Sequence, residues 1–78
     1  MTEQQITELV RAELPDARVQ VGGDGYHFEL TVVSEAFAGL RAVQRQQRVY
    51  GALAAAIRSG ALHAVNIVAL TGAEAMAA

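Results

Sequence analysis

The sequence predicts an α+β fold in which helices cover one face of a three-stranded mixed sheet. Three observations support it: a helical repeat of apolar residues near the N-terminus, two alternating segments joined by a glycine-rich turn, and a long helical segment before a third alternating segment. The expected order is helix, strand, strand, helix, helix, strand. The glycine turn implies an antiparallel hairpin, and the helical crossover permits parallel pairing of the second and third strands.

The first helix is expected over residues 3–14. Thr2, followed three residues later by Gln5, has the spacing of a capping box, and apolar residues then recur every three or four positions. Pro15 ends this helix, because proline lacks an N–H and restricts the residue before it.

A hairpin is expected next. Residues 18–21 and residues 27–33 alternate between polar and apolar side chains, and Gly22-Gly23-Asp24-Gly25 between them is typical of a turn. The same four residues match GxxG, the backbone clamp of nucleic-acid-binding KH domains. That clamp joins two helices, whereas this segment joins two strands, so a hairpin turn is the better interpretation.

The second half of the chain is expected to be a connection, a helical crossover and a strand. Residues 34–39 form the connection, and residues 64–70 form the third strand. Between them, apolar residues at helical spacing form a face that can divide into two helices near Gly51, and Gly60 fits the C-cap. Residues 71–78 are expected as a short, frayed C-terminal tail. The predicted apolar face of the crossover consists of Leu40, Val43, Val49, Tyr50, Leu53, Ala54 and Ile57.

Composition restricts the possible function classes. The 78 residues suffice for one domain, residues 1–78, and the absence of cysteine excludes disulfides and thiolate ligands. A net charge of −2 argues weakly against a protein whose main task is to bind phosphates. The N-terminus lacks the pattern of a secretory signal and no apolar run approaches the roughly 20 residues of a membrane span, so we expect a cytoplasmic protein. Neither serine has a nucleophile-elbow context, and we do not expect an enzyme.

Two histidines are the candidate metal ligands. His27 opens the second strand and His63 precedes the third, so parallel pairing would bring both to the same end of the sheet. Strand alternation places their side chains on opposite faces unless a strand begins late or a turn reorients one ring. The alternative interpretation makes His27 a polar hairpin residue and His63 a capping or packing residue. A zinc or iron site completed by Asp24 or Glu29 is a further alternative.

Three arginines are candidate contacts for a partner or a nucleic acid. Arg41, Arg45 and Arg48 are spaced to line one face of a helix, where they could meet phosphates or an acidic protein surface. The alternative is a solvated face that keeps the protein soluble. The nearby aromatic residue, Tyr50, shares helical spacing with Leu53 and is expected in the core rather than stacked on bases.

Three segments of the chain match a known family pattern. They are Gly23-Asp24-Gly25-Tyr26-His27-Phe28, then Phe37-Ala38-Gly39 followed by Val43-Gln44-Arg45-Gln46-Gln47-Arg48-Val49-Tyr50-Gly51, and finally Leu62-His63-Ala64-Val65-Asn66-Ile67. Together they resemble the BolA family, in particular its short IbaG-like bacterial branch. The likeness runs from about Thr2 to Glu74. Ala42 stands where the family is usually basic, Gly72 stands where it usually has proline, and the C-terminal tail is short.

The resemblance implies a fold similar to the class II KH domain. It also implies an adaptor that partners a monothiol glutaredoxin and helps to ligate or transfer a shared [2Fe-2S] cluster. On this expectation His63 and His27 supply nitrogen ligands, as two histidines do in Rieske centres, while a glutaredoxin cysteine and glutathione supply sulfur. The chain alone would hold no cluster.

The resemblance implies an alternative role as well. That role is transcriptional regulation in a stress response, with DNA bound on the KH-like scaffold, and Ala42 and Gly72 weaken it. Homodimerisation of the free protein is left open.

Overall fold

The computed structural model describes residues 1–24 and 27–77. Gly25 and Tyr26, which belong to the predicted turn and to the first family segment, lie outside the described residues, as does Ala78. The elements are α1 (Glu3–Glu13), β1 (Arg18–Gly23), β2 (His27–Val33), a 3-10 turn (Glu35–Phe37), α2 (Ala42–Arg58), β3 (Ala64–Leu70) and α3 (Gly72–Ala77). The predicted α+β class is confirmed.

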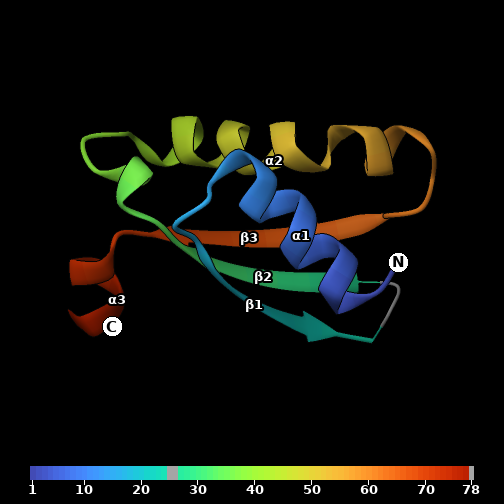
Figure 1. Ribbon diagram of the computed structural model, residues 1–78, viewed down its shortest axis with the longest axis horizontal. Coiled ribbons are helices and arrows are strands. Elements are labelled where there is room, and N and C mark those ends of the chain that lie inside the picture. The colour runs from blue at the N-terminus through green and yellow to red at the C-terminus, as the bar shows by residue number, and fades with distance from the viewer. Residues whose placement is uncertain (25–26, 78) are drawn as a thin grey trace.

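The three strands form one mixed sheet in the order β1-β2-β3. β1 and β2 are antiparallel, whereas β2 and β3 are parallel, with His27 opposite Ala64 and Val33 opposite Leu70. α1 packs on β1 and α2, and α2 packs on β3, so both helices cover the same face of the sheet (Figure 1). In the strand order β1-β2-β3, β2 is the central strand, and β1 and β3 are the two edge strands.

The first helix begins and ends where its capping signals predict. The Thr2 hydroxyl accepts a hydrogen bond from the Gln5 backbone N–H at 3.1 Å, and the Gln5 side chain accepts one from the Thr2 N–H at 2.9 Å. The helix ends at Glu13, two residues before Pro15. The capping box is thus confirmed.

A polar network ties the loop after α1 to the segment after β2. The buried Ser34 hydroxyl donates to Asp16 Oδ1 at 2.7 Å, and the Glu35 N–H donates to Asp16 Oδ2 at 2.9 Å. These two hydrogen bonds, that from Ser34 first, hold the pKa of Asp16 below its ordinary value. The network fixes the 3-10 turn, which carries Phe37 into the core.

The glycine-rich segment after β1 is a hairpin turn as far as the structure describes it. Gly23 has φ +121°, and a Cβ there would lie 1.9 Å from the carbonyl oxygen of His27. Only glycine fits this position without displacing the opposite strand. The Asp24 N–H then donates to the same His27 carbonyl at 3.3 Å.

Two predictions about the crossover are wrong. α2 runs without a break through Gly51, so the chain has one long helix there instead of two. The buried residues of α2 are Val49, Leu53 and Ala56, and part of its predicted apolar face is exposed. The exposed members of that face, with their exposed fractions, are Val43 (60%), Tyr50 (40%) and Ile57 (37%).

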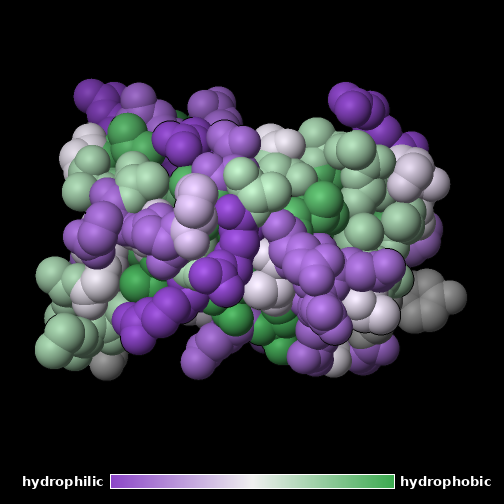
Figure 2. Space-filling view, in the orientation of Figure 1, coloured by the Kyte–Doolittle hydropathy of each residue, from purple (hydrophilic) through white to green (hydrophobic). Residues whose placement is uncertain are grey.

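The surface reflects how the helices sit on the sheet. Figure 2 shows hydrophobic residues over the C-terminal half of α2, beside the hydrophilic outer face of α1. Within residues 1–24 and 27–77, no helix has the length and apolar character that a membrane span requires.

Candidate functional site

The two histidines lie at the same end of the sheet. His27 is the first residue of β2, and His63 comes directly before β3. Because these strands are parallel neighbours with His27 opposite Ala64, the two histidines begin adjacent strands about 4.8 Å apart. Figure 1 shows the starts of β2 and β3 side by side at the end of the molecule near the N-terminus. Both histidines are exposed.

The main chain of His27 is held by a neighbouring carboxylate. Its backbone N–H donates to Asp24 Oδ1 at 2.9 Å, and its ring Nδ1 lies 4.0 Å from the same oxygen. The His27 side chain is 75% exposed and that of Asp24 is 72% exposed. A contact this open to water contributes little to stability. The backbone hydrogen bond therefore fixes the start of β2, while the imidazole stays accessible to a ligand.

His27 and His63 both line one open depression of about 310 Å³. Simple strand alternation would have placed the two side chains on opposite faces of the sheet. His63 lies one residue before β3, which begins at Ala64, so the alternation of the strand does not determine the direction of its side chain. The other residues that line the depression are Phe28, Tyr50, Ile57, Ala64, Val65 and Asn66.

The donors around this depression do not make a complete metal site. Within the part of the chain that the structure describes, no group of three or more histidine, cysteine, aspartate or glutamate side chains could hold a metal ion. The alternative of a zinc or iron site completed by Asp24 or Glu29 is therefore wrong. Two accessible imidazoles can supply two nitrogen ligands, and the remaining ligands must come from another molecule.

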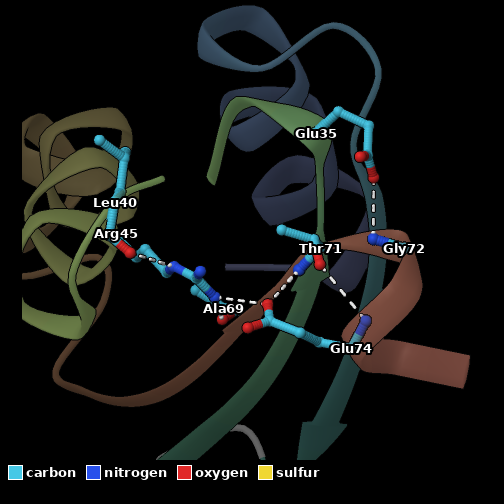
Figure 3. Close-up of polar contacts among 7 residues, drawn as sticks. All are labelled: Glu35, Leu40, Arg45, Ala69, Thr71, Gly72 and Glu74. Carbon is cyan, nitrogen blue, oxygen red and sulfur yellow. Dashed lines mark hydrogen bonds and ion pairs between the residues drawn. The ribbon is translucent and has the colours of Figure 1, made fainter. Parts of the chain in front are cut away.

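Arg45 lies at the opposite end of β3 and is part of the fold. Its Nε donates to the Leu40 carbonyl at 3.0 Å, and its Nη1 donates to the Ala69 carbonyl at 3.2 Å and to Glu74 Oε1 at 2.6 Å (Figure 3). The Arg45 side chain is only 14% exposed. This guanidinium joins α2, the end of β3 and α3, so its hydrogen-bonding groups face protein rather than solvent.

Glu74 is the residue that ties α3 to this arginine. It also forms a capping box with Thr71: the Thr71 N–H donates to Glu74 Oε1 at 2.8 Å, and the Glu74 N–H donates to the Thr71 hydroxyl at 3.3 Å. The hydrogen bond from Arg45, and after it the one from the Thr71 N–H, lowers the pKa of Glu74 from 4.5 to about 2. A further bond, from the Gly72 N–H to Glu35 Oε2 at 2.8 Å, holds the first turn of α3 (Figure 3).

The three arginines do not form one open row. Arg41 precedes α2 as its N-cap residue, and its backbone N–H donates to the Gln44 side chain at 2.9 Å. Arg48 is exposed, and its Nε lies 3.8 Å from Glu13 Oε1 of α1. With Arg45 bound inside the fold, only Arg41 and Arg48 of the three present their side chains openly to solvent.

Two residues of α2 belong to the candidate site although the sequence placed them in the core. Tyr50 and Ile57 line the histidine depression, and the Tyr50 hydroxyl donates to the Val65 carbonyl at 3.2 Å. Their seven-residue spacing puts both on one face of α2. No signal in the sequence separates this exposed face from the buried one, because both are apolar.

Comparison with known proteins identifies the family. Residues 6–74 match the model of the family described as BolA-like protein. The acid stress protein IbaG of Escherichia coli (strain K12) is 40% identical over 74 residues, which cover 95% of this chain and 88% of that protein.

Solved structures agree with this match. A BolA protein homologue from Coxiella burnetii superposes with a TM-score of 0.85 and 32% identity, covering 97% of each chain. The BolA domain of SufE1 from Arabidopsis thaliana superposes with a TM-score of 0.80 and 34% identity, covering 95% of this chain and 98% of that domain. The matched fold, the matched segment and the identity to IbaG lead to one conclusion: this chain belongs to the BolA-like family.

Proposed function

We propose that this chain is an adaptor that receives a [2Fe-2S] cluster as cargo, shared with a monothiol glutaredoxin and glutathione. His63 is the principal ligand from this chain and His27 is the second. The observation that carries the proposal is one depression lined by two exposed histidines, His27 and His63, at the starts of adjacent parallel strands.

The ligand types in this chain support a cluster that is shared with another molecule rather than held by this chain alone. The chain has no cysteine, so it supplies nitrogen ligands alone, and a [2Fe-2S] cluster with two histidines on one iron has precedent in Rieske centres. A glutaredoxin cysteine and glutathione would provide the sulfur ligands. The open shape of the depression leaves room for a second protein to approach both rings.

Family context supports an iron–sulfur-related role. In Arabidopsis thaliana a BolA domain is part of SufE1, and that domain superposes on nearly the whole of this chain. BolA membership together with this fusion to a SufE-like protein points to iron–sulfur metabolism. The role that we propose for this chain is then to bind and orient the cargo.

The protonation of the imidazoles should control this binding. A histidine binds a metal through a neutral ring nitrogen, so protons compete with the iron for the same lone pair. The shared complex should therefore weaken on acidification. A mixed histidine and cysteine ligand set should also give a visible spectrum different from that of a cluster held by thiolates alone.

The test uses the full chain with a monothiol glutaredoxin that carries its cluster. Visible circular dichroism and size-exclusion chromatography are recorded on mixing, for the wild type, His63→Ala, His27→Ala and Asn66→Ala. Asn66 lines the same depression and has no imidazole, which makes it the matched control. We expect the wild type and Asn66→Ala to form a complex with a new spectrum, His63→Ala to lose that spectrum, and His27→Ala to weaken it.

Two results would contradict the proposal. One is the absence of any complex between the wild type and the loaded glutaredoxin. The other is an unchanged spectrum for the complex of His63→Ala, since the ring would then contribute no ligand.

The alternative of DNA binding has less support from the geometry. It requires an open row of cations, and Arg45 is instead bound to Glu74 and to two backbone carbonyls. A salt titration tests it directly, because phosphate contacts give a steep fall of log K with log salt concentration. A flat response, or equal binding by an Arg41→Ala/Arg48→Ala variant, would exclude it.

A further inference from the structure

β3 is an edge strand whose own sequence has no protection against pairing with another strand. Its seven residues, Ala64–Leu70, include no charged residue and no proline, and three of them are β-branched. Charged side chains, especially lysine, and prolines are common means by which natural edge strands avoid joining other sheets. A short uncharged segment of high β propensity is the kind that pairs with copies of itself.

The outer edge of β3 is instead covered by side chains of α2. The Tyr50 hydroxyl donates to the Val65 carbonyl at 3.2 Å, and the Gln46 amide donates to the Ile67 carbonyl at 2.7 Å. Arg45 donates to the Ala69 carbonyl at 3.2 Å. The three acceptors are alternate residues of the strand, so their carbonyls all point to the same side.

That side faces away from β2. The carbonyl of Leu70, which has the opposite parity, accepts a hydrogen bond from the Ser34 N–H just beyond the end of β2. Carbonyls of successive residues point to opposite sides of a strand, so those of Val65, Ile67 and Ala69 point outward. The N–H groups of these three residues point outward with them.

We infer that Tyr50, Gln46 and Arg45 close the β3 edge against a second copy of this chain. An incoming strand must donate its own N–H groups to the carbonyls of Val65, Ile67 and Ala69, which already accept from α2. It must also displace an aromatic ring and a guanidinium that lie over the strand. The closure works through hydrogen bonds, because side chains of α2 already occupy the carbonyls that an added strand would use.

The other edge of the sheet is protected by its own sequence. β1 carries the charged Arg18 at its start and Gly22-Gly23 at its end, where Gly23, in the last pair of the ladder, has a positive φ. Charge and glycine weaken strand addition at β1. At β3 the closure comes from a different element, α2, and this is why its removal should reveal a specific surface.

The test compares Gln46→Ala/Tyr50→Phe with the wild type and with Gln47→Ala. The double variant removes two donors, keeps the ring of Tyr50 and leaves Arg45 in place. Gln47 is the next residue of α2, exposed and of the same type, so Gln47→Ala is the matched control. Sedimentation equilibrium should show self-association about tenfold or more stronger for the double variant, a factor that the net contribution of one or two hydrogen bonds gives. Gln47→Ala should associate like the wild type.

Amide hydrogen exchange identifies the surface used. In the associated double variant, the amides of Val65, Ile67 and Ala69 should gain protection, because they point outward along the edge. Adding Val68→Lys should return the double variant to wild-type association. Val68 is exposed, and a lysine on an edge strand opposes pairing with another strand.

The inference fails on either of two results. The first is a double variant that keeps the far-ultraviolet circular dichroism of the wild type and associates no more strongly. The second is stronger association with new protection in residues 18–23 and none at Val65, Ile67 and Ala69.

Discussion

The ion pair between Arg45 and Glu74 predicts how the C-terminal end of the protein responds to acid. The hydrogen bond from Arg45 is the largest cause of the lowered pKa of Glu74, which falls from 4.5 to about 2 in the folded protein. A folded pKa below the unfolded one means that ionised Glu74 stabilises the folded state. That contribution is complete above the unfolded value of 4.5 and is lost as the pH falls toward about 2.

The perturbation is Arg45→Met, which keeps an unbranched apolar side chain and removes the guanidinium. The midpoint of Glu74 should rise from about 2 toward 4.5, a change of up to about 2.5 pH units (4.5 − 2). It should stay somewhat below 4.5, because the Thr71 N–H still donates to the carboxylate. At pH values between these midpoints, the wild type should keep α3 attached while the variant releases it.

The assay is an NMR titration that follows the side-chain carboxyl shift of Glu74 and the amide shifts of α3. Arg48→Met is the matched control, since Arg48 lies on the same helix and faces Glu13 at 3.8 Å. We expect it to leave the Glu74 midpoint unchanged. A wild-type midpoint near 4.5, or an equal shift in Arg48→Met and Arg45→Met, would refute the role of Arg45.

Three further predictions concern stability, each measured by denaturant unfolding monitored by circular dichroism. Phe37→Ala should lower the free energy of unfolding by about 3–5 kcal/mol because the ring is fully buried, whereas Val43→Ala should change it by less than about 0.5 kcal/mol; equal effects would contradict the assigned core. Gly23→Ala should destabilise by more than about 1 kcal/mol, because its Cβ would lie 1.9 Å from a backbone oxygen at φ +121°, and a neutral result would mean that the turn differs from the one described. Gly51→Ala should stabilise by about 0.5–1 kcal/mol, since an added Cβ meets nothing within 4 Å in the helix interior; destabilisation would indicate a contact at that position.

Local signals predicted most of the fold. The capping box at Thr2 and the glycine turn before β2 depend on residues within a few positions of one another, and the structure places both as expected as far as it describes them. The predicted break near Gly51 is wrong because glycine in a helix interior has only a modest energetic cost. The packing of buried residues before and after Gly51 in α2 overcomes that cost.

The apolar face of α2 shows that helical periodicity does not predict which of its apolar residues are buried. Val49 and Tyr50 are both apolar enough to be core residues, yet Val49 is buried and Tyr50 is 40% exposed. The sheet has only three strands and two helices share its face, so α2 sits over the edge strand β3. The outer side of α2 then extends past the edge of the sheet. The position of α2 over that edge depends on tertiary packing and not on local sequence.

The sequence alone predicted the first helix, the three strands, the two candidate histidines and the family, because each rests on residue types at short or fixed spacing. It did not predict that the crossover is one helix or that Gly72–Ala77 form α3. Tertiary structure decided what those residues do. Parallel pairing of β2 with β3 brought His27 and His63 to one depression. Arg45, which the sequence offered as a surface contact, instead donates hydrogen bonds to Ala69 at the end of β3 and to Glu74 of α3. Such partners lie 24 and 29 residues from Arg45 along the chain, and only the folded sheet brings them together.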